Sequence, residues 1–155
     1  LRSPEVNFLG IDMTDVVLAR ARRRIDAAGV GNVRITAWDI ERIRDMLAPE
    51  DRIDRIYINF CNPWPRKKHN KKRLTHPRQL TQYKDFLAEG REIWFKTDND
   101  ALFEFSLEEF KEFGLPLLTV SRDLHHTEIL NEAQTEYEQR FSALGKNINF
   151  CEVVF

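Results

Sequence analysis

Four polar side chains stand directly after short apolar runs that predict buried strands. They are Asp12, Asp39, Asn62 and Asp98. In a parallel sheet the carboxyl ends of the strands share one edge, and ligands bind at that edge. Carboxylates accept hydrogen bonds there, and an amide both donates and accepts them. The placement of these residues therefore predicts a ligand-binding site at one edge of a sheet.

The first two acids have a binding interpretation and a structural one. Asp12 ends a predicted strand, where an acid commonly accepts hydrogen bonds from ribose hydroxyls. Asp39 is placed to accept a hydrogen bond from an adenine amino group. Each of them would equally serve as the N-cap of the helix that follows. The residues alone leave both interpretations open.

The most specific element is Asn62-Pro63-Trp64-Pro65. Its two prolines restrict the backbone and predict a rigid loop directly after a buried strand. A side-chain amide and a flat aromatic ring are then held at the edge of the sheet, where they can orient a planar base. The alternative is a structural turn with a packed Trp.

A run of positive charge follows this loop. Residues 66–73 read RKKHNKKR and carry six positive charges; they are called the basic tract below. The whole chain has a net charge of −1, so the remainder carries −7. Most such runs are solvated surface, but this position beside the predicted active loop favours contact with a phosphate backbone. The arginines at 20 and 22–24 are predicted to be a solvated helix face.

Composition narrows the class of protein. Hydrophobic residues make up 42% of the 155 positions, which supports a packed core and argues against disorder. The two cysteines are widely spaced, and no run has the length of a membrane helix or the pattern of a signal peptide. These features predict a cytoplasmic protein with free thiols. His125 and His126 are adjacent and would point apart, and the histidines show no ligand spacing, so no metal is predicted.

Strand and helix patterns alternate along the chain. Strands are predicted over residues 6–11, 33–37, 53–60, 92–97, 117–120 and 149–155, and helices over 15–28, 40–47, 77–88, 101–113 and 135–141. This alternation predicts an α/β fold with a mainly parallel, twisted sheet that helices cover on both faces. We expect a single domain over residues 1–155.

Five motifs occur in one order along the chain. They are FLGID at 8–12, DRIYINF at 54–60, NPWP followed by the basic tract, FKTDN at 95–99 and TEYE at 135–138. Together they resemble the bacterial tRNA (guanine-N7-)-methyltransferase family over essentially the whole chain. The resemblance implies a class I, Rossmann-like fold. It also implies methyl transfer from S-adenosyl-L-methionine to N7 of the guanine at position 46 in the variable loop of tRNA.

The resemblance also assigns roles to individual residues. It implies that Asp12 holds the ribose of the cofactor, that Asp39 holds its adenine end, and that Asn62 is the active-site residue and touches the cofactor. It implies substrate contacts by Arg66, Asp98, Thr135, Glu136, Tyr137 and Glu138, and RNA contacts by Lys68, His69, Asn70, Lys71, Lys72 and Arg73. The enzyme would act in the cytoplasm on tRNA as a monomer or homodimer.

The chain departs from the family pattern in two places. The glycine-rich loop and first central strand, which the family places before residue 6, are absent, so we expect them upstream and expect residues 1–155 to be N-terminally incomplete. Asn62 stands where the family has Asp. Guanine N7 carries an in-plane lone pair and no proton, so the reaction needs alignment more than a general base. Asn62 is therefore compatible with activity.

Two other functions fit part of the pattern. Amino-methyltransferases that act on adenine or cytosine use an Asn-Pro-Pro-aromatic loop, but here Trp64 replaces the second Pro. A non-catalytic RNA-binding domain would also use the basic tract. Cofactor binding distinguishes this last class from both kinds of enzyme.

Overall fold

The computed structural model describes residues 3–129 and 134–155, and the chain divides into two compact units. Unit 1 comprises Leu1–Ala48 and unit 2 comprises Pro49–Phe155. In both units strands and helices alternate, as the sequence predicts. None of the helices that the structure describes is long and apolar enough to span a bilayer.

Unit 1 is a β-α-β element followed by a 3₁₀ helix. Strand β1 (Phe8–Asp12) pairs in parallel with β2 (Val33–Ala37), and helix α1 (Asp15–Ala28) connects them. The 3₁₀ helix η1 (Ile40–Asp45) follows β2. Helix α1 ends at Gly29, whose φ of 62° lies in the left-handed region that favours glycine. Asp12 pairs with Ala37, so the two strands end side by side.

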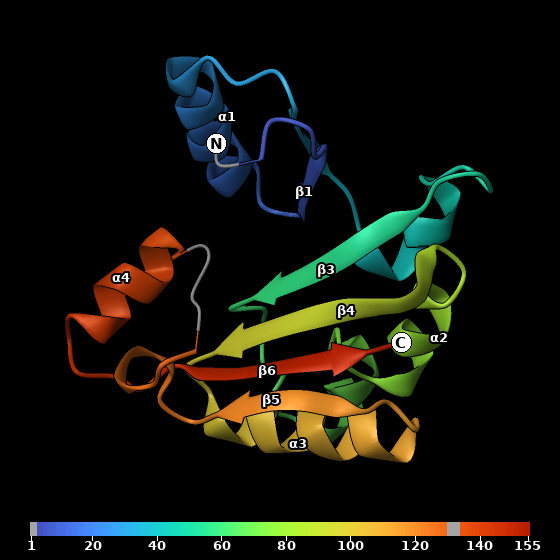
Figure 1. Cartoon of the computed structure of the whole chain (residues 1–155), viewed down its shortest axis with the longest axis vertical. Coiled ribbons are helices and arrows are strands. Elements are labelled where there is room, and N and C mark those ends of the chain that lie inside the picture. The colour runs from blue at the N-terminus through green and yellow to red at the C-terminus, as the bar shows by residue number, and fades with distance from the viewer. Residues whose placement is uncertain (1–2, 130–133) are drawn as a thin grey trace. The chain divides into compact units, whose positions relative to one another are not determined.

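Unit 2 is built on a sheet with the strand order β3-β4-β6-β5. Strand β3 (Ile53–Asn59) pairs in parallel with β4 (Leu87–Thr97). Strand β6 (Asn149–Val154) lies antiparallel between β4 and β5 (Leu117–Ser121). Three of the four strands of this sheet therefore point the same way, and β6 runs against them (Figure 1). With the parallel pair in unit 1, this confirms the predicted α/β fold with a mainly parallel sheet.

The helices of unit 2 pack on this sheet or follow its strands. They are η2 (Lys67–Lys72), α2 (Pro77–Tyr83), α3 (Asp100–Glu112), η3 (Leu124–His126) and α4 (Glu136–Ser142). The ring of Phe103 in α3 stacks on Phe95 of β4, and both are fully buried. The predicted helix over 77–88 was too long, because Leu87 pairs with Ile53 and begins β4. The predicted loop over the basic tract contains η2.

Helix α4 lies beside the carboxyl ends of β3 and β4 (Figure 1). It begins with a capping box between Thr135 and Glu138. A helix of seven residues is marginal by itself, so its position depends on contacts with the sheet. Near it, Phe60 and Trp94 pack on a small buried cluster of Leu124, Ile148 and Phe150.

Candidate functional site

Unit 1 places its two predicted acids at the shared end of β1 and β2. Trp38 donates its backbone N–H to the carbonyl of Asp12 at 3.2 Å, and Asp39 follows directly. Asp12 Oδ1 accepts from the Thr14 N–H at 2.7 Å, and Asp39 Oδ1 accepts from the Glu41 N–H at 2.9 Å. Asp39 is therefore the N-cap of η1, as the structural interpretation predicts, whereas Asp12 braces the turn before α1, whose N-cap is Thr14. Each bond uses one carboxylate oxygen, so the pair still offers acceptors at the edge, which suits a ribose and an adenine.

In unit 2 the loop after β3 has an unusual backbone. Phe60 and Trp64 have φ angles of 52° and 43°, in a region that costs non-glycine residues on the order of 1 kcal/mol or more. Asn62 lies between them, and its Oδ1 accepts from the Trp64 N–H at 3.1 Å. This bond turns the loop and leaves the amide nitrogen of Asn62 as a donor at the exposed surface.

Arg73 holds this loop in place through two hydrogen bonds to its backbone. Its Nε donates to the carbonyl of Pro63 at 3.0 Å and its guanidinium NH₂ donates to the carbonyl of Trp64 at 3.1 Å. The guanidinium also lies over the ring of Phe105, 4.2 Å from the centroid, and the residue is buried. Arg73 thus supports the strained loop, and its predicted contact with RNA stays a prediction that this burial disfavours.

The remainder of the basic tract forms a charged surface next to the loop. The exposed cations of the tract are Arg66, Lys67, Lys68, Lys71 and Lys72, whereas His69 and Asn70 are half-buried. The ammonium of Lys72 lies 4.9 Å from the ring centroid of Trp64, and the ring of His69 meets the same indole edge-on at 5.5 Å. The loop and the tract therefore form one continuous polar and aromatic surface.

Asp98 lies where β4 ends and meets two residues from distant parts of the chain. The Tyr137 hydroxyl donates to Asp98 Oδ2 at 3.4 Å, and Lys146 Nζ lies 3.3 Å from the same oxygen. Partial burial, together with the negative charge of Asp98, raises the pKa of Tyr137, so its hydroxyl stays protonated and remains a donor. The Tyr137 ring packs on Phe60 at 4.7 Å and on Phe141 at 4.2 Å between centroids.

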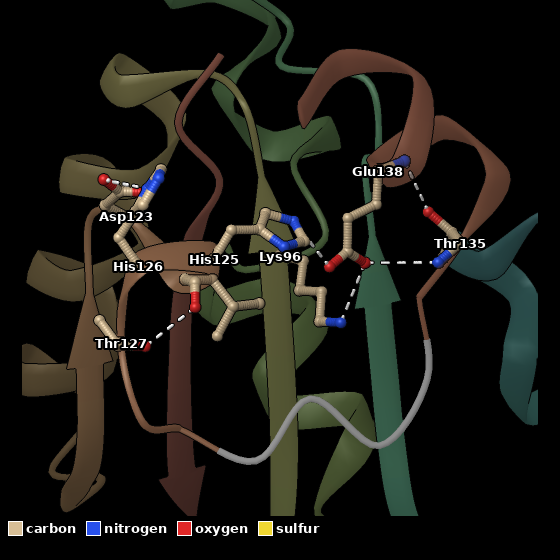
Figure 2. Close-up of polar contacts among 8 residues, drawn as sticks. Lys96, Asp123, His125, His126, Thr127, Thr135 and Glu138 are labelled. Atoms are coloured by element: carbon tan, nitrogen blue, oxygen red, sulfur yellow. Dashed lines mark hydrogen bonds and ion pairs between the residues drawn. The ribbon is translucent and has the colours of Figure 1, made fainter. Parts of the chain in front are cut away.

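The predicted substrate residues of the TEYE segment divide into two groups. Glu136 and Tyr137 are exposed, whereas Glu138 is fully buried. Glu138 Oε2 accepts from Lys96 Nζ at 3.1 Å and from the Thr135 N–H at 3.3 Å. Its other oxygen lies 3.3 Å from His125 Nε2 (Figure 2). Glu138 therefore faces the sheet, while Tyr137 faces Asp98.

The remaining candidates take simple structural roles. His126 bonds to Asp123 at 2.9 Å and His125 faces Glu138, so the two histidines point apart as predicted (Figure 2). Burial raises the pKa of the Cys61 thiol to about 11, which keeps it protonated and a poor nucleophile. Among residues 3–129 and 134–155, no group of three His, Cys, Asp or Glu side chains is arranged to hold a metal ion.

Sequence reasoning missed three residues of this region. Lys96, His125 and Lys146 all contact predicted site residues. Lys96 had a usable signal, because it is a cation in the mainly apolar strand predicted over residues 92–97, directly before Asp98. Lys146 lies in a polar loop and His125 in a polar stretch, and neither position is distinctive before the chain folds.

Comparison with known proteins identifies the family. A family model with the description "Putative methyltransferase" matches residues 1–151. The tRNA (guanine-N(7)-)-methyltransferase of Clostridium perfringens (strain SM101 / Type A) is 48% identical over 153 residues, which cover 95% of this chain and 70% of that protein. This chain belongs to the tRNA (guanine-N(7)-)-methyltransferase family. A member from Desulfitobacterium hafniense (strain Y51) is 43% identical over 148 residues, covering 96% of this chain and 68% of the relative.

Solved structures of other methyltransferases share the fold of this chain at low sequence identity. The N-methyltransferase NodS from Bradyrhizobium japonicum WM9, in complex with S-adenosyl-L-homocysteine, superposes with a TM-score of 0.61 at 14% identity. The match covers 96% of this chain and 66% of NodS. An rRNA methylase from Streptococcus thermophilus gives a TM-score of 0.59 at 15% identity, covering 96% of this chain and 72% of that one. The fold is therefore that of class I methyltransferases.

Proposed function

We propose that this protein transfers a methyl group from S-adenosyl-L-methionine to N7 of a guanine in tRNA, in the variable loop at position 46. The 48% identity with a tRNA (guanine-N(7)-)-methyltransferase carries this proposal. The two units would work as one methyltransferase domain, and the family match across residues 1–151 supports this because it spans both. The substrate makes the cytoplasm the expected compartment.

The carboxylates of unit 1 suit the proposed cofactor. Asp12 and Asp39 would hold the ribose hydroxyls and the adenine amino group, since both acids offer acceptors at the carboxyl end of a parallel strand pair. When bound, S-adenosyl-L-methionine supplies a methyl carbon that is activated by an adjacent sulfonium. In unit 2, Asn62 offers an exposed amide that is held by the braced loop and can orient cofactor or base by hydrogen bonding.

Asp98 and Tyr137 would bind the target base. The N1–H and amino group of guanine are donors, so they suit the carboxylate of Asp98. Tyr137 is exposed beside it, so its side chain can contact the base. N7 has no proton to lose, so no residue is needed as a general base. Positive charge grows on the purine as N7 is methylated, and the carboxylate of Asp98 stabilises that charge.

The proposed activity has a direct test. The complete protein is incubated with unmodified tRNA and with cofactor that is labelled in the methyl group, and the tRNA is then digested to nucleosides. We expect label in N7-methylguanosine, and we expect none when the target guanine is replaced by adenosine. Label in a methylated amino group of adenine or cytosine would favour the amino-methyltransferase alternative, and binding of RNA without cofactor binding would favour an RNA-binding domain.

Asn62 provides a test of the mechanism. Because N7 needs no deprotonation, Asn62→Asp in the complete protein should keep the rate within about tenfold of wild type. Asn62→Ala should lose more, since it removes the hydrogen bond that shapes the loop and the donor that orients a ligand, each worth on the order of 1 kcal/mol. Single-turnover rates for the two variants measure this. Near-wild-type rates for both would exclude Asn62 from the site.

A further inference from the structure

We propose that Lys96 is a positioning residue that locks the guanine-binding side chains in place through Glu138. This inference rests on the function proposed above, because it assigns Tyr137 and Asp98 to the target base. Lys96 itself lies away from the surface: its side chain is 7% exposed, and that of Glu138 is fully buried. Neither can reach tRNA without leaving this position, so both act through the residues that they hold.

The backbone of Lys96 organises the floor of the site. Its carbonyl accepts from the Phe60 N–H at 2.9 Å, where the parallel pair of β3 and β4 ends. The Phe60 ring then packs under Tyr137, with 4.7 Å between centroids. Two residues further along the chain, directly after β4, Asp98 accepts from the Tyr137 hydroxyl. Lys96 is therefore bonded to Phe60, which packs on the Tyr137 ring, and stands two residues before Asp98, which binds the Tyr137 hydroxyl.

The side chain of Lys96 fixes the helix that carries Tyr137. Lys96 Nζ donates to Glu138 Oε2 at 3.1 Å, and the same oxygen accepts from the Thr135 N–H at 3.3 Å (Figure 2). Thr135 Oγ1 in turn accepts from the Glu138 N–H at 3.0 Å, which completes the capping box. The ammonium therefore anchors the first turn of α4 to the end of β4, and Tyr137 lies within that turn.

A charged pair suits this task better than an apolar contact. Apolar packing is non-directional and tolerates sliding, whereas an ammonium and a carboxylate must meet at one distance with their hydrogen bonds in place. A buried charged pair adds little net stability, because desolvation offsets the attraction between the charges. Separating the pair leaves a buried charge without its partner, so the paired arrangement is strongly preferred. His125 Nε2, at 3.3 Å from Glu138 Oε1, encloses the carboxylate from the other side.

Hydrogen exchange in the complete protein tests the anchor independently of activity. In Lys96→Met, amides of residues 135–142 should exchange at least tenfold faster, while those of β4 and β6 keep their protection. Arg122→Met is the matched control, because it breaks an exposed pair with Glu104 at 2.6 Å and should leave exchange in residues 135–142 unchanged. Unchanged protection of residues 135–142 in Lys96→Met, or equal loss throughout unit 2, would overturn the proposal. Glu138→Gln, which is isosteric, replaces Lys96→Met if that variant does not fold.

A double-mutant cycle tests the link to methyl transfer. Tyr137→Phe should lower kcat in the wild-type background by several-fold but have little effect in Lys96→Met, whose own kcat should fall without a change in cofactor Kd. Such non-additivity is expected only if Lys96 acts through Tyr137. Effects that simply multiply would make Lys96 a stabilising residue and would refute the proposal. A wild-type protein that makes no N7-methylguanosine would refute the proposed function, and hydrogen exchange would still decide whether the anchor exists.

Discussion

Replacing Asp98 with Asn should lower kcat/KM for tRNA by about 10²- to 10³-fold, the range seen when one preorganised electrostatic group is lost from an active site. The change keeps the size of the side chain but removes its charge. It also places an amide donor where the proposed guanine presents donors, so one hydrogen bond becomes a repulsion. The carboxylate that should stabilise positive charge on the methylated purine is lost at the same time.

Single-turnover methylation at saturating cofactor measures this effect, together with cofactor affinity and thermal unfolding. Both of the latter should change little, because Asp98 bonds only to the side chains of Tyr137 and Lys146 among the contacts described here and both partners are exposed. Asp123→Asn is the matched control: it neutralises a half-buried acid just beyond β5, which pairs with His126. If Asp98→Asn stayed within about threefold of wild type, the guanine would have to bind elsewhere.

Replacing Lys67, Lys68 and Lys71 with Ala should weaken tRNA binding roughly 100-fold or more at about 50 mM salt. All three are exposed cations of the basic tract, in a chain whose remainder carries net negative charge. Each lost phosphate contact should flatten the dependence of log K on log salt by about 0.7–0.9. Lys72 is kept because it packs on Trp64. Cofactor affinity should not change, because phosphate contacts position RNA and do not build the cofactor pocket.

Two control variants separate charge from support of the loop. Arg20→Ala combined with Arg23→Ala removes exposed cations from α1 and should leave the salt slope unchanged. Arg73→Met should instead lower the free energy of unfolding by about 2 kcal/mol, since it breaks two hydrogen bonds from a buried guanidinium. Titrations of tRNA across a salt series measure the salt dependence of binding for each variant. An unchanged slope in the triple variant would show that the tract is ordinary solvated surface, and a flattened slope in the α1 variant would move the RNA path there.

Local chemistry made most of the fold predictable from sequence. Helix α1 ends before Gly29 because a glycine readily adopts the left-handed conformation that ends a helix. The spacing of its apolar residues predicts the remainder of the helix from Asp15. The acids at 12, 39 and 98 lie at or just beyond the ends of their strands because polar residues end buried runs. The errors fall where long-range pairing outweighs local preference. Residues 84–88 continue a helical pattern, but Leu87 gains a strand partner in Ile53, some thirty residues earlier in the chain.

The sequence by itself determined the fold class, the family and the strand-end positions of the candidate residues, because each is a property of short segments. Tertiary structure alone decided which members of a motif face outward. Arg73 and Lys72 are adjacent cations, yet one is buried beneath the loop and the other is exposed. Tyr137 and Glu138 are neighbours in TEYE, yet one meets Asp98 and the other meets Lys96. A charged side chain is buried only where a partner of opposite charge is present. Lys96 and Glu138 lie 42 residues apart in the sequence, so no local pattern could predict that they pair.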